Sequence, residues 1–334
     1  QGTEKFVLTD HTNAGGDETT SHIMGYYQTD QPEQGESQLT FTFAGDVMLG
    51  REIGYQFQTN NFQDLFSNFG NRVFWGTDIS WLNMEGPVSD QTVIQDRQPD
   101  DLVFLFSKEA LAVVEYLKLT TVGLANNHTA NQGRTGLDTT RRMIEQISAD
   151  WVGDPYGIND TSVKRYTFGD QSVSLVAVNV FDGDLTGLTE LISQEHDAGY
   201  FVIVLPHWGN EYQTTHSSRQ ESLAHDWITA GADLIVGMHP HVVQDAEIID
   251  GKLVLYSLGN FVFDQTFSKE TQQGLIVTGV LSDDEVEVVL VPIVSRKLKP
   301  ELAWGDEKQV LVNRICQSIE KYCNDGTIIL ERNN

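Results

Sequence analysis

The pattern of hydrophobic and polar positions changes abruptly after residue 38. Residues 1–38 are rich in Gly, Thr, Gln, Asp and Glu, and their scattered apolar residues follow neither a helical nor a strand period. From Leu39 onward, Leu39, Phe41 and Phe43 alternate with smaller or polar residues up to Gly45, which is typical of a β-strand. We therefore expect a flexible polar N-terminal tether over residues 1–38 and one domain over residues 39–334.

Short apolar runs and amphipathic segments follow one another through most of that domain. The runs of strand length lie at 79–82, 120–124, 201–205, 233–236 and 253–256. Helical periodicity occurs at 108–118, 135–147 and 217–230. This alternation predicts an α/β fold with a largely parallel sheet and helices on its faces. After residue 256 we expect an antiparallel hairpin and then a last helix, at 275–280, 286–294 and 308–322.

Composition and charge exclude some classes of function. Hydrophobic residues make up 40% of the chain, which is enough for a sizeable core. The formal charge of -27 excludes sequence-independent binding to nucleic acid, because such binding needs Lys and Arg to neutralise phosphates. We therefore expect no nucleic-acid partner. No apolar run approaches the roughly 20 residues of a membrane span.

Of the two cysteines, Cys316 lies in the last predicted helix and Cys323 directly follows it. Seven residues apart on a continuous helix, they would be roughly 10 Å from each other, which is beyond the reach of a disulfide. They could pair only if the helix were broken between them. We expect two unpaired thiols.

Polar side chains of metal-binding type follow several of the predicted strands. In chain order they are Asp46, Glu85, Asn127, His128, His207, His239 and His241. Ligands bind outside the carboxyl ends of strands in open α/β sheets, so these side chains are expected to meet at one rim. Carboxylates and imidazoles suit divalent Mn, Fe or Zn, and the sequence therefore predicts a metal-dependent hydrolase-type active site.

Each of these signals is weak when it is taken alone. Gly45-Asp46 is also a common turn, and a buried His207 is often only a hydrogen-bonded core residue. In His239-Pro240-His241, an extended backbone would point both imidazoles the same way, with Pro240 stiffening their separation. The convergence of several strand ends favours the functional reading. The remaining histidines are expected to be ordinary surface residues: His11, His22, His196, His216 and His225.

Short motifs follow one another along the chain. They begin with Gly45-Asp46-Val47-Met48-Leu49-Gly50-Arg51, Asn83-Met84-Glu85-Gly86-Pro87 and Ala125-Asn126-Asn127-His128. They continue with His207-Trp208-Gly209-Asn210-Glu211-Tyr212, Gly237-Met238-His239-Pro240-His241 and Tyr256-Ser257-Leu258-Gly259-Asn260-Phe261-Val262-Phe263-Asp264. In this order the motifs resemble those of the CapA family of poly-γ-glutamate capsule biosynthesis proteins, and the resemblance spans most of the chain.

The CapA family is in turn similar to the calcineurin-like metallophosphatases, and this implies a four-layer α/β/β/α sandwich. Carried over by motif, Asp46 and His241 would hold one metal ion. A second ion would be held by Asn127, His207 and His239. Glu85 would bridge the two ions, and His128 matches the position that acts on the leaving group.

The sequence departs from these families at two positions. Met48 stands where the phosphatases have a histidine, so the first metal position loses a ligand. Asn131 stands where the CapA pattern usually has Asp, which bears on any acid-base role there. Arg51 either grips a substrate phosphate or carboxylate or pairs with a structural acid, and both alternatives stay open. Asn126 and Glu211 are expected to orient the ligands.

Two functions are compatible with these residues. The first is a metal-dependent hydrolase, with one or two divalent ions, that acts on a phosphoester or on an amide of the anionic capsule polymer. The second is a non-catalytic, metal-containing binding or scaffold subunit of a polymer synthesis and export machine. The resemblance implies a place on the extracellular face of the cell beside a membrane-bound synthesis complex. The chain begins at Gln1 rather than Met, and we expect a membrane anchor in a segment outside it.

Overall fold

The computed structural model describes residues 4–6, 26–28, 38–59, 62–70, 72–94 and 102–332. The chain divides into two compact units, Gln1–Ser37 and Gln38–Asn334. In the first unit, β1 (Glu4–Phe6) pairs with β2 (Tyr26–Gln28) in an antiparallel ladder. The rest of the expected tether lies outside the described residues, so its flexibility stays a prediction.

The second unit is built on two β-sheets. The ten-stranded sheet has the order β17 (Cys323–Asn324), β18 (Thr327–Glu331), β15 (Glu285–Arg296), β14 (Gln273–Leu281), β3 (Leu39–Val47), β4 (Ile79–Met84), β5 (Thr121–Gly123) and β6 (Asp150–Val152). Two short strands extend it, β13 (Asn260–Val262) on β3 and β16 (Lys299–Leu302) on β15. The six-stranded sheet has the order β11 (Ala246–Ile249), β12 (Lys252–Leu255), β10 (Leu234–Val236), β9 (Phe201–His207), β8 (Gln171–Asn179) and β7 (Val163–Phe168).

The ten-stranded sheet is parallel from β3 to its edge strand β6, and the six-stranded sheet is parallel in its centre. Strands β3 to β6 run parallel to one another, as do β8, β9, β10 and β12. The long β14–β15 hairpin adds antiparallel strands beside β3, as the sequence predicted. The carboxyl ends of both sets of parallel strands are therefore the places where a site can form.

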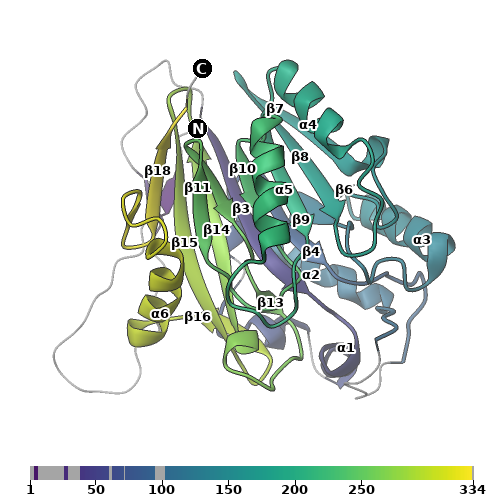
Figure 1. The fold of residues 1–334 in the computed structure, drawn as a ribbon. Helices are drawn as coiled ribbons and strands as arrows, with labels where there is room; N and C mark the ends of the chain where they lie inside the picture. The colour runs from purple at the N-terminus through teal and green to yellow at the C-terminus, as the bar shows by residue number, and fades with distance from the viewer. Residues whose placement is uncertain are drawn as a thin grey trace, which may run out of the picture. The chain divides into compact units, whose positions relative to one another are not determined.

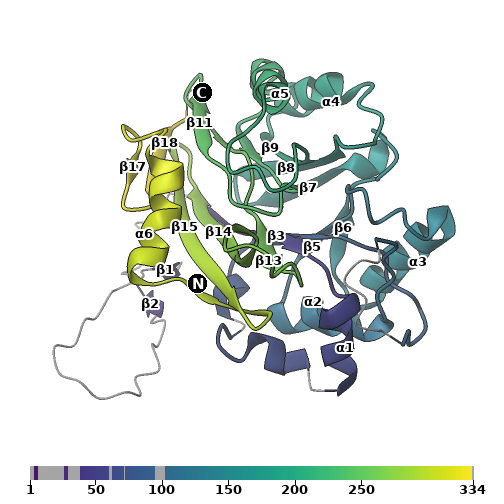
Figure 2. The ribbon, with the colours of Figure 1, turned by 60° about the horizontal axis from the view of Figure 1, so that its bottom comes forward.

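Most helices cover the outer faces of the two sheets, whereas the last one contacts both sheets and packs into the core between them. The helices are α1 (Arg51–Thr59), α2 (Leu111–Leu117), α3 (Gly133–Gln146), α4 (Leu188–Asp197), α5 (Ser218–Thr229) and α6 (Gly305–Cys316). The 3-10 turns are η1 (Phe62–Phe66), η2 (Arg72–Phe74), η3 (Lys108–Ala110), η4 (Asp160–Ser162) and η5 (Glu270–Gln272). Figures 1 and 2 show α4 and α5 over the six-stranded sheet and α2 and α3 beside β4 to β6. The four-layer sandwich that the resemblance implied is confirmed.

The central strands are apolar on both faces because both faces are buried. In β8, Val173 and Leu175 face the core between the two sheets, whereas Val176 and Val178 pack under α4 and α5. Alternate side chains of a strand point to opposite faces, so a strand between two layers must be apolar at nearly every position. This explains why the central strands show as short continuous apolar runs in the sequence.

The C-terminal region differs from its prediction. Helix α6 ends at Cys316 rather than continuing to Tyr322, and the chain turns back into β17 at Cys323. This turn brings the Cα atoms of Cys316 and Cys323 to 5.3 Å from each other, and the two cysteines form a disulfide. The expectation of two unpaired thiols was wrong because it assumed an unbroken helix. Among the described residues, no helix has the length and apolar character needed to cross a bilayer.

Candidate metal centre

The two sheets bring the predicted site residues to one place from two directions. The ten-stranded sheet supplies Asp46 at the end of β3 and Glu85 just after β4, and Asn127 and His128 follow β5. The six-stranded sheet supplies three imidazoles, with His207 ending β9 and with His239 and His241 following β10. The strand-end prediction holds, but the rim belongs to two facing sheets rather than to one.

The first group of ligand atoms comes from His207, His239 and Asn127, and we call it the nitrogen group after its two imidazoles. The Nε2 atom of His207 lies 2.8 Å from Oδ1 of Asn127 and 3.0 Å from Nδ1 of His239. These are the three residues that the resemblance assigns to one metal ion. Three ligand atoms of this type at such short separations can share a single divalent ion.

The second group is built from Asp46, Glu85 and His241, and we call it the acidic group. One ligand atom from each lies within 4.8 Å of the others. His241 is central, because its Nδ1 atom is 3.4 Å from Asp46 and its Nε2 atom is 3.6 Å from Glu85. Glu211 forms a further group of the same kind with His239 and His241. Glu211, which we expected only to orient ligands, therefore has a carboxylate at ligand distance.

Several polar atoms in this centre are buried without a hydrogen-bond partner. They are both carboxylate oxygens of Glu85 and Nε2 of His239. An unpaired buried carboxylate is costly, and proteins normally pair such a group or use it to bind a metal. The donor set of carboxylates, imidazoles and an amide oxygen also matches Mn, Fe or Zn. The residues present therefore fit divalent metal ions.

Burial and neighbouring charges separate the pKa values of the two groups. Burial, followed by the neighbouring imidazoles, lowers the pKa of His239 to about 4 and that of His207 well below its usual value. Burial raises the pKa of Glu85 to about 8, although His241 opposes this shift. Burial alone would lower the pKa of His241, but the nearby carboxylates, with Glu85 first, outweigh it and raise that pKa to about 9. At neutral pH the imidazoles of the nitrogen group are therefore neutral, whereas Glu85 and His241 hold at least one proton between them.

The backbone at His239-Pro240-His241 is bent rather than extended. His239 has φ 97° and His241 has φ 58°, so both lie in the left-handed region that non-glycine residues rarely adopt. Their rings are 5.9 Å apart and both face the centre. The predicted convergence is correct, but the extended geometry invoked for it was wrong. Strained backbone of this kind is concentrated at functional sites in proteins.

Asparagine side chains link the parts of the site. The Nδ2 atom of Asn83 lies 2.8 Å from Asp46 and 3.3 Å from Nδ1 of His207, so it connects the two sheets. Asn126 donates to Asn83, which agrees with its expected orienting role. Asn260 places its Oδ1 atom 3.0 Å from Nδ1 of His241. Their positions within the family motifs were the signal that could have identified Asn83 and Asn260.

His128 lies at the edge of the centre in a fixed orientation. The Oδ1 atom of Asn131 accepts the backbone N–H of Phe104 at 2.8 Å, and it lies 3.0 Å from Nδ1 of His128. Since an amide oxygen can only accept, Nδ1 of His128 carries the proton and donates it. Its Nε2 atom faces Glu85 at 3.9 Å. Burial lowers the pKa of His128, and the bond to Asn131 only partly opposes this.

Arg51 makes the structural ion pair that was one of its two predicted roles. Its Nε and terminal nitrogen atoms both bind the Asp264 carboxylate, with Nε at 3.1 Å from Oδ2. Its guanidinium also lies over the rings of Phe104 and Phe263. A direct role for Arg51 in binding substrate stays a prediction.

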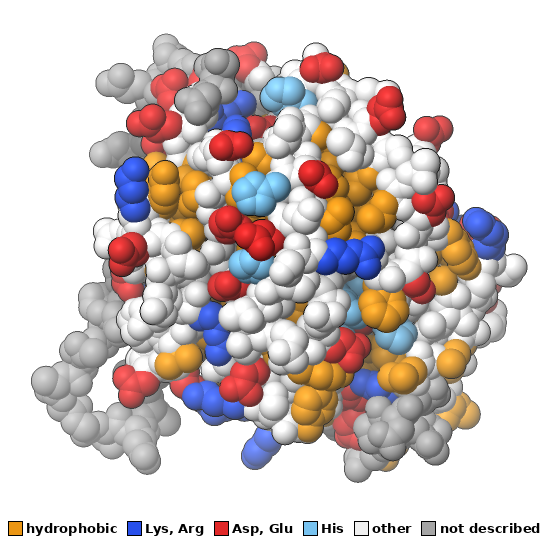
Figure 3. All heavy atoms as spheres, viewed as in Figure 1, with side chains coloured by type: hydrophobic (Ala, Val, Ile, Leu, Met, Phe, Trp, Pro, Cys, Tyr) orange, Lys and Arg blue, Asp and Glu red, His pale blue; other side chains and the backbone are white. Residues whose placement is uncertain are grey.

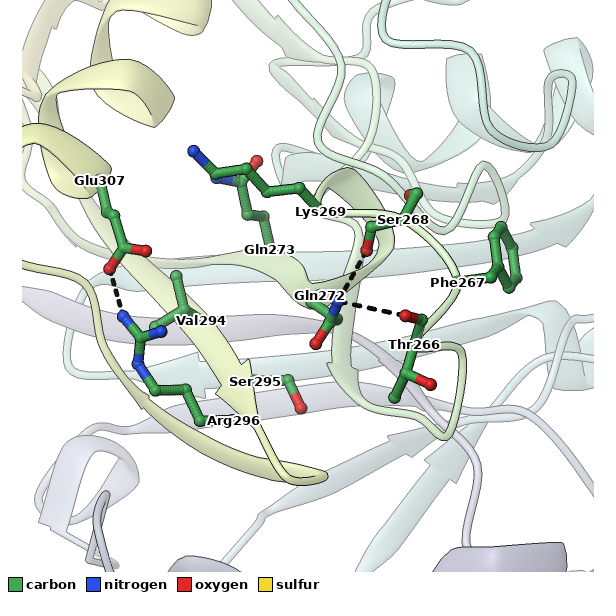
Figure 4. Close-up of a pocket in the computed structure, with 10 residues that line it drawn as sticks. All are labelled: Thr266, Phe267, Ser268, Lys269, Gln272, Gln273, Val294, Ser295, Arg296 and Glu307. Carbon is green, nitrogen blue, oxygen red and sulfur yellow. Dashed lines mark hydrogen bonds and ion pairs between the residues drawn. The ribbon is translucent and has the colours of Figure 1, made fainter.

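A cavity of about 320 Å³ lies outside the centre, and none of the predicted site residues lines it. It lies between β15 and the loop before β14, with Arg296 and Glu307 paired at one end (Figure 4). At the other end Phe267 packs edge-on against Tyr212, whose ring is 6.2 Å from that of His241. This cavity is a neighbour of the metal centre and not the centre itself.

Comparisons with known proteins agree with the motifs. A family model described as bacterial capsule synthesis protein PGA_cap matches residues 40–183 and 159–265. The chain is 29% identical over 256 residues to the PGA biosynthesis protein CapA of Bacillus subtilis, covering 71% of this chain and 67% of that protein. It is 29% identical over 322 residues to the capsule biosynthesis protein CapA of Bacillus anthracis, covering 87% and 75%. A hypothetical protein from Thermus thermophilus is a structural neighbour with a TM-score of 0.44 and 16% identity, covering 78% and 96%.

Proposed function

Because the chain belongs to the family of bacterial capsule synthesis proteins of the PGA_cap type, we propose that it is a metal-dependent hydrolase of capsule biosynthesis. Its substrate is either a phosphoester or the anionic polymer poly-γ-glutamate, which it would cleave at an amide bond. The proposal combines the family with the chemistry of the buried centre. Neither the family nor the fold would be sufficient alone, because function depends on the site.

One observation carries the proposal. Two groups of metal-type ligand atoms meet where the two sheets face each other, and several of these atoms are buried without a hydrogen-bond partner. A hydrogen-bonded core would have satisfied them. Asn127, His207 and His239 would hold one ion, and Asp46 and His241 another, with Glu85 as the bridging carboxylate that the resemblance implies.

The chemistry divides between the ions and the protein. Divalent ions bound here supply Lewis acidity and lower the pKa of bound water. The protein's own residues position and handle protons. Asn83 and Asn260 orient Asp46, His207 and His241 through their amides. His128 holds or delivers a proton at Nε2, since its Nδ1 proton is engaged by Asn131.

One observation favours the alternative of a non-catalytic scaffold subunit. Met48 occupies the position of a phosphatase ligand, and its sulfur accepts the backbone N–H of Gly50 at 3.1 Å. Hard or borderline ions do not favour a thioether, so the acidic group offers a weaker metal position. A scaffold that uses one ion for structure or polymer docking would tolerate that loss. His128, which is no expected ligand, favours the enzyme.

The partners and location follow from the family and are part of the same proposal. The named relatives are capsule or polyglutamate synthesis proteins. We infer action at the extracellular face of the cell, beside a membrane-bound polymer synthesis complex.

The test is a substrate panel with a defined metal content. Elemental analysis of purified protein is followed by assays with phosphodiesters and γ-glutamyl oligomers, with Mn or Zn added. Turnover that disappears after chelation and returns with metal supports the hydrolase. His128→Ala serves as the matched variant, because it should lose turnover while keeping metal. Metal binding without turnover of any substrate would favour the scaffold.

A further inference from the structure

A second cavity, of about 280 Å³, opens beside the nitrogen group of the metal centre. Its wall includes Phe181, whose ring lies 4.9 Å from that of His239. It also includes Trp208, which directly follows His207 in the chain. A substrate whose reacting bond lies at the metal centre can therefore extend into this cavity.

The cationic side chain on this wall belongs to Arg219, the second residue of α5. Arg219 is exposed, and within the described ranges of the chain no acidic side chain forms an ion pair with it. The situation of Arg51 is the opposite, because its guanidinium is buried and bound to Asp264 through two nitrogen atoms. The guanidinium of Arg219 is thus available to an external anion.

The wall around Arg219 is held in place by its neighbours. The side chain of Gln220 accepts the N–H of Ser217 at 2.9 Å and donates to Gln244 at 2.9 Å. Gly209 has φ 93°, and a Cβ atom there would lie 2.7 Å from the Gln220 side chain. Only glycine therefore allows the chain after His207 to approach this closely. The backbone that carries Arg219 is therefore fixed, so that binding a ligand has to order only its side chain.

An anionic polymer can bind to this acidic protein only where a positively charged side chain lies close to the site. The net charge of -27 repels an anionic polymer from the surface as a whole. Figure 3 shows basic side chains scattered among acidic ones on the face drawn. Salt screens this repulsion over about 8 to 10 Å, so contact depends on charges within the site. An exposed guanidinium beside aromatic side chains supplies such a charge, and its planar donors match carboxylate and phosphate oxygens.

We propose that Arg219 and this cavity bind an anionic oxygen group of the substrate, a carboxylate or a phosphate, next to the bond at the metal centre. The assignment rests on the proposed function for the nature of the substrate. It makes Arg219, rather than Arg51, the arginine that recognises substrate.

The experiment measures binding directly and needs no turnover. The full chain, loaded with Zn, is titrated by calorimetry with a γ-linked glutamate pentamer and, separately, with inorganic phosphate. Arg219→Gln is compared with Arg142→Gln, an exposed arginine on α3 paired with Asp90, which makes the same change in net charge. Arg219→Lys keeps the positive charge but cannot form the bidentate hydrogen bonds of a guanidinium.

We expect Arg219→Gln to weaken binding of at least one probe about tenfold, with Arg219→Lys intermediate and Arg142→Gln unchanged. Loss confined to the pentamer identifies a carboxylate, and loss confined to phosphate identifies a phosphate. Unchanged binding of both probes in Arg219→Gln would overturn the inference. An equal loss in Arg142→Gln would also overturn it, because the effect would then come from overall charge. If the protein binds the pentamer through Arg219 but cleaves nothing, the proposed hydrolase fails and this inference stands.

Discussion

The two sheets contribute different chemistry to the same centre. The ten-stranded sheet supplies oxygen ligands, from Asp46, Glu85 and Asn127, whereas the six-stranded sheet supplies nitrogen ligands, from His207, His239 and His241. Each sheet alone presents an incomplete set. The centre therefore exists only when the sheets pack face to face through their shared apolar core.

This difference explains how the fold tolerates so many buried polar groups. Glu85 and His241 share protons at neutral pH, whereas His207 and His239 stay neutral because they are buried beside one another. Asn83 joins the two sets through its amide, with contacts to Asp46 and His207. Cations can compensate the charge that packing alone leaves unpaired.

The largest effect is expected from removing ligands on opposite sides of the centre. His207→Ala should abolish the tighter of two metal-binding steps, because the nitrogen group has three neutral ligands already in place. Asp46→Ala should remove mainly the weaker step, since Met48 leaves that position short of a ligand. We expect a loss above about 100-fold for each, because even partners behind metal ligands are worth about 10–100-fold. Calorimetric metal titration checks this, and two equal steps in the unmodified protein would contradict it.

Removing His128 is expected to separate catalysis from metal binding. His128→Ala should lower kcat by about 10²–10⁴-fold, because a positioned proton donor or acceptor contributes that much. Both metal steps should remain, since His128 belongs to neither ligand group. Elemental analysis and turnover, measured on the same sample, check this. Loss of a metal ion in this variant would mean that His128 is a ligand.

The pH dependence should distinguish the two groups of ligands. In the metal-free protein, the raised pKa values of Glu85, to about 8, and of His241, to about 9, mean that this pair shares protons at neutral pH, and an incoming ion must displace them. Metal affinity of the acidic group should therefore rise from pH 6 to 9, by about tenfold per pH unit for each displaced proton. The pKa values of His207 and His239 are lowered, so an ion at the nitrogen group displaces only the proton of the bridging Glu85, and its affinity should rise less steeply than that of the acidic group. Titrations at several pH values check this, and parallel curves for both steps would contradict it.

The smallest effect on the centre is expected from the disulfide at the far end of the ten-stranded sheet. The Cys316–Cys323 bond joins the end of α6 to β17. Replacing both cysteines by serine should cost about 2 kcal/mol of unfolding free energy, the chain-entropy value for so short a loop. Metal affinity should not change, because no predicted ligand lies on these elements. Denaturant unfolding and metal titration of the double variant check the two expectations separately.

The sequence by itself determined much of the fold and the membership of the site. Apolar runs of strand length located the central strands, because a strand buried on both faces must be apolar along its length. Polar residues placed directly after those runs identified Asp46, Glu85, Asn127, His207 and His239. These signals depend only on residues that are neighbours in the chain, so a single sequence is enough to recognise them.

Only the tertiary structure decided how those pieces combine. Periodicity does not say that the strands divide between two sheets, that Arg51 pairs with Asp264, or that α6 ends in time for Cys316 to reach Cys323. It also missed the positive φ of His239 and the bridging position of Asn83. Each of these depends on contacts between residues distant in the chain or on where a helix stops. Such contacts are set by the packing of whole layers, whereas hydrophobic periodicity reports only which face of one element is buried.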